Sequence, residues 1–205
     1  MMRLIPTLCL VLAGTAAAEI PPGETHDGLF VRVGMGPKYG FGLADGRKGG
    51  GLQTHGYSAG FDIQIGFSHF ENFALHGDVA FTRIVGRKLG SKPTQDIEID
   101  SFTNNLDYRL LALGLGATWW LPPRNIYLTV GIGYARLSVQ DDGQQASRDD
   151  TAIGFRLNTM VGREWYFYKD LSIGIGGQFT WSLAVDRAAT WNILGFGLVV
   201  TAAYN

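Results

Sequence analysis

The sequence predicts an all-β protein: a closed eight-stranded antiparallel transmembrane β-barrel with an up-and-down meander. Three observations predict it. Eight stretches alternate between an apolar and a small or polar face, the connections between them alternate in length, and only 17% of the 205 residues are charged. About a quarter of the residues of a soluble protein are usually charged. Much of this protein's surface is therefore expected to face something other than water.

Period-two alternation is the mark of a strand with two different faces. One face of every stretch is apolar and carries no charged residue. In chain order the stretches are residues 29–35, 57–67, 73–81, 111–119, 126–134, 153–161, 171–183 and 194–204.

The second face of the stretches is rich in glycine, alanine, serine and threonine, with Gly-x-Gly pairs such as Gly34/Gly36 and Gly114/Gly116. A strand surface in water normally carries longer polar side chains. Repeated glycine is typical of the cramped interior of a small closed barrel, whose apolar outer face meets lipid. A soluble, lipocalin-like barrel is the alternative. The Gly-x-Gly pairs match no dinucleotide-binding fingerprint, because no βαβ unit surrounds them.

The connections support a membrane barrel. Long connections join the first and second, third and fourth, and fifth and sixth stretches, whereas only a few residues join most of the others. The last connection, around 185–189, is also short. Outer-membrane barrels have long extracellular loops and tight periplasmic turns, and strands of about 10 residues match the membrane thickness.

Aromatic residues gather toward the two ends of the stretches, as expected for girdles at two membrane interfaces. Those near the short turns are Phe67, Phe70, Phe73, Trp119, Trp120, Tyr127, Trp165, Tyr166, Phe167, Tyr168 and Tyr204. Those near the long loops are Tyr57, Phe81, Tyr108, Tyr134, Trp181 and Trp191.

The N-terminus has the features of an export signal. Residues 1–18 combine an early arginine, a short apolar stretch and the small-residue run Ala16–Ala18. This pattern predicts a signal peptide cleaved before Glu19. Residues 19–27 then form a short N-terminal segment, and residues 28–205 form the barrel.

The chain resembles the small eight-stranded outer-membrane barrels of Gram-negative bacteria, the OmpA/OmpX/OmpW-like group, over nearly all of residues 28–205. The most specific piece is the last strand, which ends like the assembly signal of such barrels, although Asn205 follows the final aromatic residue. The residues that carry this match are Leu198, Val200, Ala202 and Tyr204. The resemblance implies a place in the bacterial outer membrane, in the cell envelope. It also implies outer-membrane lipid, lipopolysaccharide and the barrel-assembly machinery as partners.

Five ionisable residues fall on the inward face: Arg32, Asp62, Asp78 and Arg156, with His76 beside them. Isolated charges in a low-dielectric interior are unfavourable, so these groups should pair. We interpret this lumen charge network as a static plug of salt bridges. The alternative is a gate or a narrow ion path lined by the same charges.

No motif points to chemistry, so we expect no catalytic residues, no cofactor and no metal. A formal net charge of −1 gives no basic footprint for nucleic acid. The acidic loop residues, for example Asp141 and Asp142, fit no EF-hand spacing.

We expect a non-catalytic protein with a structural or surface-interaction role. A small passive, porin-like channel is the second interpretation, and a lipid A-modifying enzyme is the third. The sequence names no extracellular ligand.

The export signal predicts that the mature protein begins at Glu19. Intact-mass measurement on the protein purified from the outer-membrane fraction should give the mass of residues 19–205. A soluble periplasmic protein, or a membrane protein that retains Met1, would contradict this interpretation.

Overall fold

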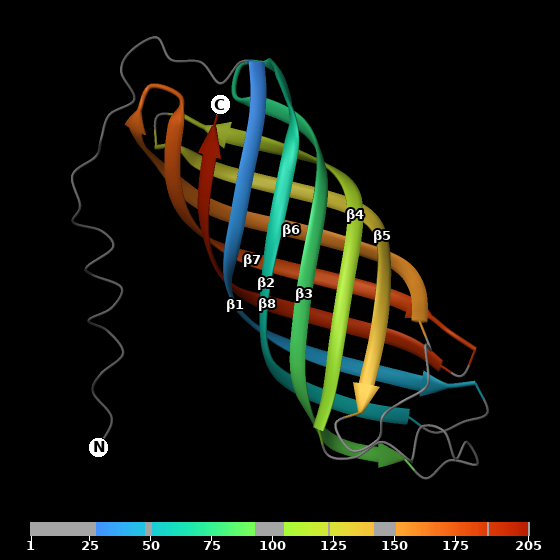
Figure 1. Ribbon diagram of the computed structural model, residues 1–205. Coiled ribbons are helices and arrows are strands. Elements are labelled where there is room, and N and C mark those ends of the chain that lie inside the picture. Colours follow the sequence, from blue (N-terminus) through green and yellow to red (C-terminus); the bar gives the residue numbers. More distant parts are fainter. Residues whose placement is uncertain are drawn as a thin grey trace, which may run out of the picture.

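The computed structural model describes residues 28–47, 51–92, 105–122, 124–141, 151–187 and 189–204. Within them the chain forms one closed barrel, in which each strand pairs antiparallel with the next and the last pairs with the first (Figure 1). The strands are β1 (Gly28–Gly46), β2 (Gly51–Phe70), β3 (Phe73–Lys92), β4 (Asn105–Leu121), β5 (Ile126–Asp141), β6 (Thr151–Tyr168), β7 (Leu171–Val185) and β8 (Ala189–Tyr204). The expected fold class is confirmed. Among the described residues, no helix is long and apolar enough to cross a membrane.

The strands are strongly tilted, as their pairing register requires. Paired residues can be followed from strand to strand around the barrel, and the path that leaves β1 at Val31 returns to it at Phe41, ten residues further along. Ten residues of stagger over eight strands correspond to a tilt of about 40° to the barrel axis. A barrel of this size is only wide enough for side chains to fill it.

Apolar side chains cover the outside of the barrel. Leu115 is 72% exposed and Ile132 is 60% exposed, and similarly exposed apolar residues occur on all eight strands. A continuous apolar surface of this extent would drive aggregation in water, whereas lipid solvates it. The protein is therefore an integral membrane barrel of the outer-membrane type.

Two tight turns at one end of the barrel depend on asparagine. Asn72 and Asn125 have φ angles of 61° and 50°, in the left-handed region that asparagine tolerates better than most residues. Their carbonyl oxygens accept hydrogen bonds from the backbone N–H groups of Trp120 (2.9 Å) and Glu164 (3.0 Å). The turns thereby hold in place two residues whose side chains meet inside the barrel. The predicted signal peptide and the segment 19–27 lie outside the described residues.

The strands are longer than expected, with 15 to 20 residues each. Much of what the sequence suggested to be long loops continues the ladders, and the connection from β1 to β2 is only residues 47–50. In these extensions the outward residues become polar, for example Arg83, Asp107 and Arg109, so apolar alternation stops while hydrogen bonding continues. The predicted apolar outer face holds within the eight stretches, and the outward charges lie in the extensions beyond them.

Four of the aromatic residues assigned to the girdles face the lumen instead. Tyr108, Trp120, Tyr127 and Trp191 are buried inside the barrel, whereas neighbours such as Trp119 are exposed outside. Successive residues of a strand point to opposite faces, so in a pair such as Trp119-Trp120 only one ring reaches lipid. The inward aromatic rings contribute to the packed interior.

Leu115→Arg should destabilise the folded barrel by about 2–4 kcal/mol, because the side chain lies near the middle of the apolar belt. Val85→Arg places the same charge at the outer edge of the belt, where the expected loss is about 0–1 kcal/mol. Urea titrations of the folded protein in lipid vesicles measure both values. Equal losses at the two positions would contradict the assigned depth.

Candidate functional site: the lumen of the barrel

Arg32 is the centre of the first charged layer, at the end of the barrel with the short turns. Its side chain is 1% exposed, and Nη2 and Nε donate to Oε1 of Glu164 at 2.7 Å and 3.1 Å. The other carboxylate oxygen of Glu164 accepts a hydrogen bond from Trp120 Nε1 at 2.8 Å. Glu164 is thus satisfied on both oxygens, as a buried carboxylate requires.

Aromatic rings surround the Arg32 guanidinium. Its Cζ atom lies 4.2 Å from the ring centroid of Tyr127, 5.0 Å from Phe30 and 5.5 Å from Trp120. Its Nη1 donates to Thr129 Oγ1 at 3.0 Å. Away from water, an aromatic face stabilises a cation by up to about 2 kcal/mol. The planar guanidinium fits this site, because it forms hydrogen bonds at its edge while rings pack on its faces.

Asp62 is the centre of a second charged layer, further along the barrel. Its Oδ1 accepts from Arg156 Nη2 at 2.9 Å, and its Oδ2 accepts from Gln178 Nε2 at 3.0 Å and from Lys38 Nζ at 3.4 Å. Arg156 Nη1 also lies 3.7 Å from a carboxylate oxygen of Asp78. Two cations therefore balance two anions, and all four side chains are buried.

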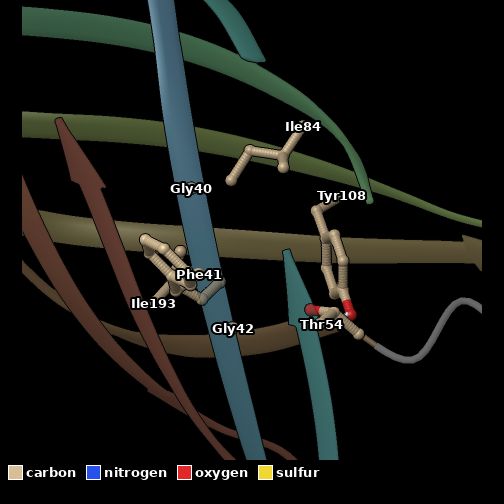
Figure 2. Close-up of a pocket in the computed structure, with 7 residues that line it drawn as sticks. All are labelled: Gly40, Phe41, Gly42, Thr54, Ile84, Tyr108 and Ile193. Carbon is tan, nitrogen blue, oxygen red and sulfur yellow. Dashed lines mark hydrogen bonds between the residues drawn. The ribbon is translucent and has the colours of Figure 1, made fainter. Parts of the chain in front are cut away.

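A third layer, toward the long connections, is apolar. Its buried residues are Ala44, Leu52, Ala80, Ile84, Tyr108, Leu110, Ala112, Ala135, Leu137, Ala152, Ala184, Ala189, Trp191 and Ile193. The Tyr108 hydroxyl donates to Thr54 Oγ1 at 2.9 Å. Beside this pair, against Gly40 and Gly42 of β1, is a cavity of about 10 Å³ (Figure 2). That is room for about one water molecule.

The order of the layers can be followed along β1. Its inward residues run from Phe30 and Arg32, through Lys38, to Ala44. The lumen therefore passes from an aromatic and charged layer to a second charged layer and then to an apolar one. Among the described residues, no three His, Cys, Asp or Glu side chains are grouped as a metal site requires.

The structure divides the five ionisable residues singled out from the sequence between the two charged layers. Arg156 contacts both Asp62 and Asp78. Arg32 lies in the other layer, and His76 is beside it, with Nε2 3.2 Å from Thr118 Oγ1 and its ring 5.5 Å from that of Phe30. The expected single network is thus two separate clusters.

Sequence reasoning missed Lys38 and Glu164. Lys38 follows Pro37 and was assigned to a loop, although β1 continues through it. Glu164 lies beyond the last clear apolar alternation of its stretch, close to a short turn. Arg156 and Asn158 face inward, and Glu164 lies an even number of positions further along β6, six after Asn158. Continuing the same alternation would therefore have placed the Glu164 side chain inside the barrel.

The last strand closes the barrel. Leu198, Val200, Ala202 and Tyr204 all face outward, and Tyr204 pairs with Val31 of β1 and with Leu171 of β7. The alternation recognised in the sequence therefore belongs to a strand that is hydrogen-bonded on both sides.

Solved structures with a similar fold include a surface protein and two proteins named as outer-membrane proteins. Neisserial surface protein A is 16% identical over 86% of this chain and 96% of that chain, with a TM-score of 0.49. The outer-membrane protease OmpT from Escherichia coli is 11% identical over 88% and 97%, with a TM-score of 0.49. The outer-membrane protein AlkL is 16% identical over 90% and 92%, with a TM-score of 0.42. No family model and no curated protein matches the sequence.

Asp62→Ala should destabilise the barrel by about 3–5 kcal/mol, because it leaves Arg156 and Lys38 buried with too little opposite charge. The double change Asp62→Ala/Arg156→Met should lower the free energy of unfolding by less than the sum of the two single changes. A double-mutant cycle on unfolding free energies measures this coupling.

The matched control cycle combines Asp62→Ala with Arg32→Met. These residues lie in different layers, so their effects should add within about 0.5 kcal/mol. Additive effects for Asp62 and Arg156 would contradict the direct pairing.

Proposed function

We propose that this protein is a closed, non-catalytic outer-membrane barrel with a structural or surface-interaction role. The observation that carries the proposal is the filling of the lumen by three successive layers. Ions need a continuous polar path, and the apolar layer that includes Leu110, Leu137 and Ile193 interrupts such a path. The buried charges are engaged with one another, as expected for groups that hold strands together.

A closed barrel of this kind interacts with other molecules through its outer surface and its extracellular end. Side chains of the described residues fill the three layers, and the cavity beside Tyr108 and Thr54 is about 10 Å³, far below the several hundred Å³ of a typical ligand pocket. Lipid and surface partners are therefore better candidates than a solute within the barrel.

A lipid A-modifying enzyme is supported less well. Such an enzyme needs a nucleophile and a base within hydrogen-bond reach near the outer rim. On β2, His55 points outward and Ser58 points inward, so the two side chains lie on opposite faces of the sheet. A small passive channel remains the second candidate, and conductance distinguishes it from a closed barrel.

The folded protein should give no steady current in planar lipid bilayers, because the apolar layer formed by the described residues interrupts the polar path that ions need. The measurement is single-channel recording at both polarities. Folding of the sample is checked by gel mobility, since a closed barrel migrates differently before and after boiling. Reproducible ohmic steps from folded protein would overturn the closed-barrel proposal in favour of the channel.

A further inference from the structure

The ladder that closes the barrel has a gap within the apolar belt. β1 and β8 lie side by side (Figure 1), and we call the ladder between them the β1–β8 seam. Met35 pairs with Val200 and Lys38 pairs with Gly197, but no pairing joins the two strands between these positions. The register is the same on both sides of the gap, so a β-bulge does not explain it. Through the apolar belt, the other seven ladders run without interruption in the residues that the structure describes.

The gap falls at a proline. Pro37 is the one proline within the eight described strands. Proline has no N–H group to donate to a ladder, and within sheets it is confined to edge strands, strand starts and bulges. On the other side of β1, Pro37 pairs with Ala59 of β2 and that ladder continues. The missing donor is therefore the one that would point toward β8.

The missing N–H group leaves an acceptor without its ladder donor. Alternate residues of an antiparallel strand exchange hydrogen bonds with opposite neighbours, so the backbone of position 37 is directed at β8. By the register of the seam, Leu198 lies opposite Pro37 and directs its carbonyl group at β1. The Leu198 side chain is 61% exposed on the lipid face, where no water replaces a lost donor. Gly36 fits beside the Leu198 carbonyl oxygen, because a Cβ atom at position 36 would collide with it.

The β1–β8 seam has no ionic reinforcement. β8 contains no charged side chain, so no ion pair joins its side chains to β1. Gly36 and Gly197 flank the gap and place no side chain in the lumen. The ring contacts across the seam lie above the gap, where Phe196 meets Tyr39 and Phe41. Below these rings the seam depends on its backbone hydrogen bonds, and one of them is missing.

We propose that the barrel opens first at the β1–β8 seam, sideways into the membrane, with Pro37 as the built-in weak point. When these strands part, fewer hydrogen bonds break than along an equal length of any other ladder in the belt. The opening is at the height of the second charged layer, because the buried Lys38 directly follows Pro37 and pairs with Asp62. Opening at this seam therefore brings lipid next to the Lys38–Asp62 pair, while the apolar layer still blocks the path along the barrel axis.

The first test measures how fast the folded barrel unfolds in SDS, from the loss of the folded band on gels over time. Pro37→Ala restores the missing N–H group and should lengthen the half-time of unfolding at least fivefold. A proline that only stiffens the chain predicts no gain or a loss, because alanine gives the unfolded chain more freedom. The matched control is Pro122→Ala, the same change in the turn that follows β4, and it should not slow unfolding. An unchanged or shorter half-time for Pro37→Ala would overturn the inference.

The second test locks the β1–β8 seam with a disulfide. Met35 and Val200 lie directly opposite each other with outward side chains, at a spacing that suits Met35→Cys/Val200→Cys. With the disulfide formed, adding Pro37→Ala should no longer change the half-time of unfolding. After reduction, the same addition should again lengthen it at least fivefold.

The matched cross-link is Leu115→Cys/Ile132→Cys, which joins β4 to β5 between two outward residues that are also directly opposite each other. It leaves the β1–β8 seam free to part, so Pro37→Ala should keep its full effect in this background. An equal effect of Pro37→Ala under both cross-links would place its action outside the seam and overturn the inference.

Discussion

Closure of eight strands with a ten-residue stagger is the constraint on which the rest of the molecule depends. Apart from the gap at Pro37, it satisfies the backbone hydrogen bonds between strands without an open edge, which a structure in lipid requires. It also leaves an interior only as wide as the side chains that fill it. Glycine is needed where strands approach most closely. A Cβ atom at Gly66 would lie 1.9 Å from the Leu75 carbonyl oxygen, and one at Gly154 would lie 1.7 Å from that of Leu183.

The narrow interior explains how the charges are arranged. Arg32 with Glu164 joins β1 to β6, and Arg156 with Asp62 joins β6 to β2, so both pairs reach across the lumen, whereas Lys38 with Asp62 links the neighbouring strands β1 and β2. Each cluster is internally neutral or nearly so, and the apolar layer separates the second cluster from the extracellular end.

Period-two alternation was enough to predict the fold, the two faces of the apolar belt and the inward position of Arg32, Asp62, His76, Asp78 and Arg156. It could not predict where strands end, because apolar alternation stops at the edge of the membrane while the ladder continues into polar residues such as Arg83 and Asp107. Glu164 and Lys38 were missed for the same reason, since each lies near or beyond the end of a clear apolar run. The division of the buried charges into two clusters depends on the stagger between strands and on how far each side chain reaches across the lumen. Neither is determined by the residues next to a charged position in the sequence.

The central claim is that water does not pass through the lumen, and exchange of the Arg32 guanidinium protons with water tests it most directly. In the barrel reconstituted in lipid, nuclear magnetic resonance can follow the Arg32 Nε–H signal and compare it with that of Arg83 at the exposed rim in the same sample. A sealed lumen predicts that the Arg32 proton exchanges with water far more slowly than the Arg83 proton. Equally fast exchange at the two residues would contradict the account.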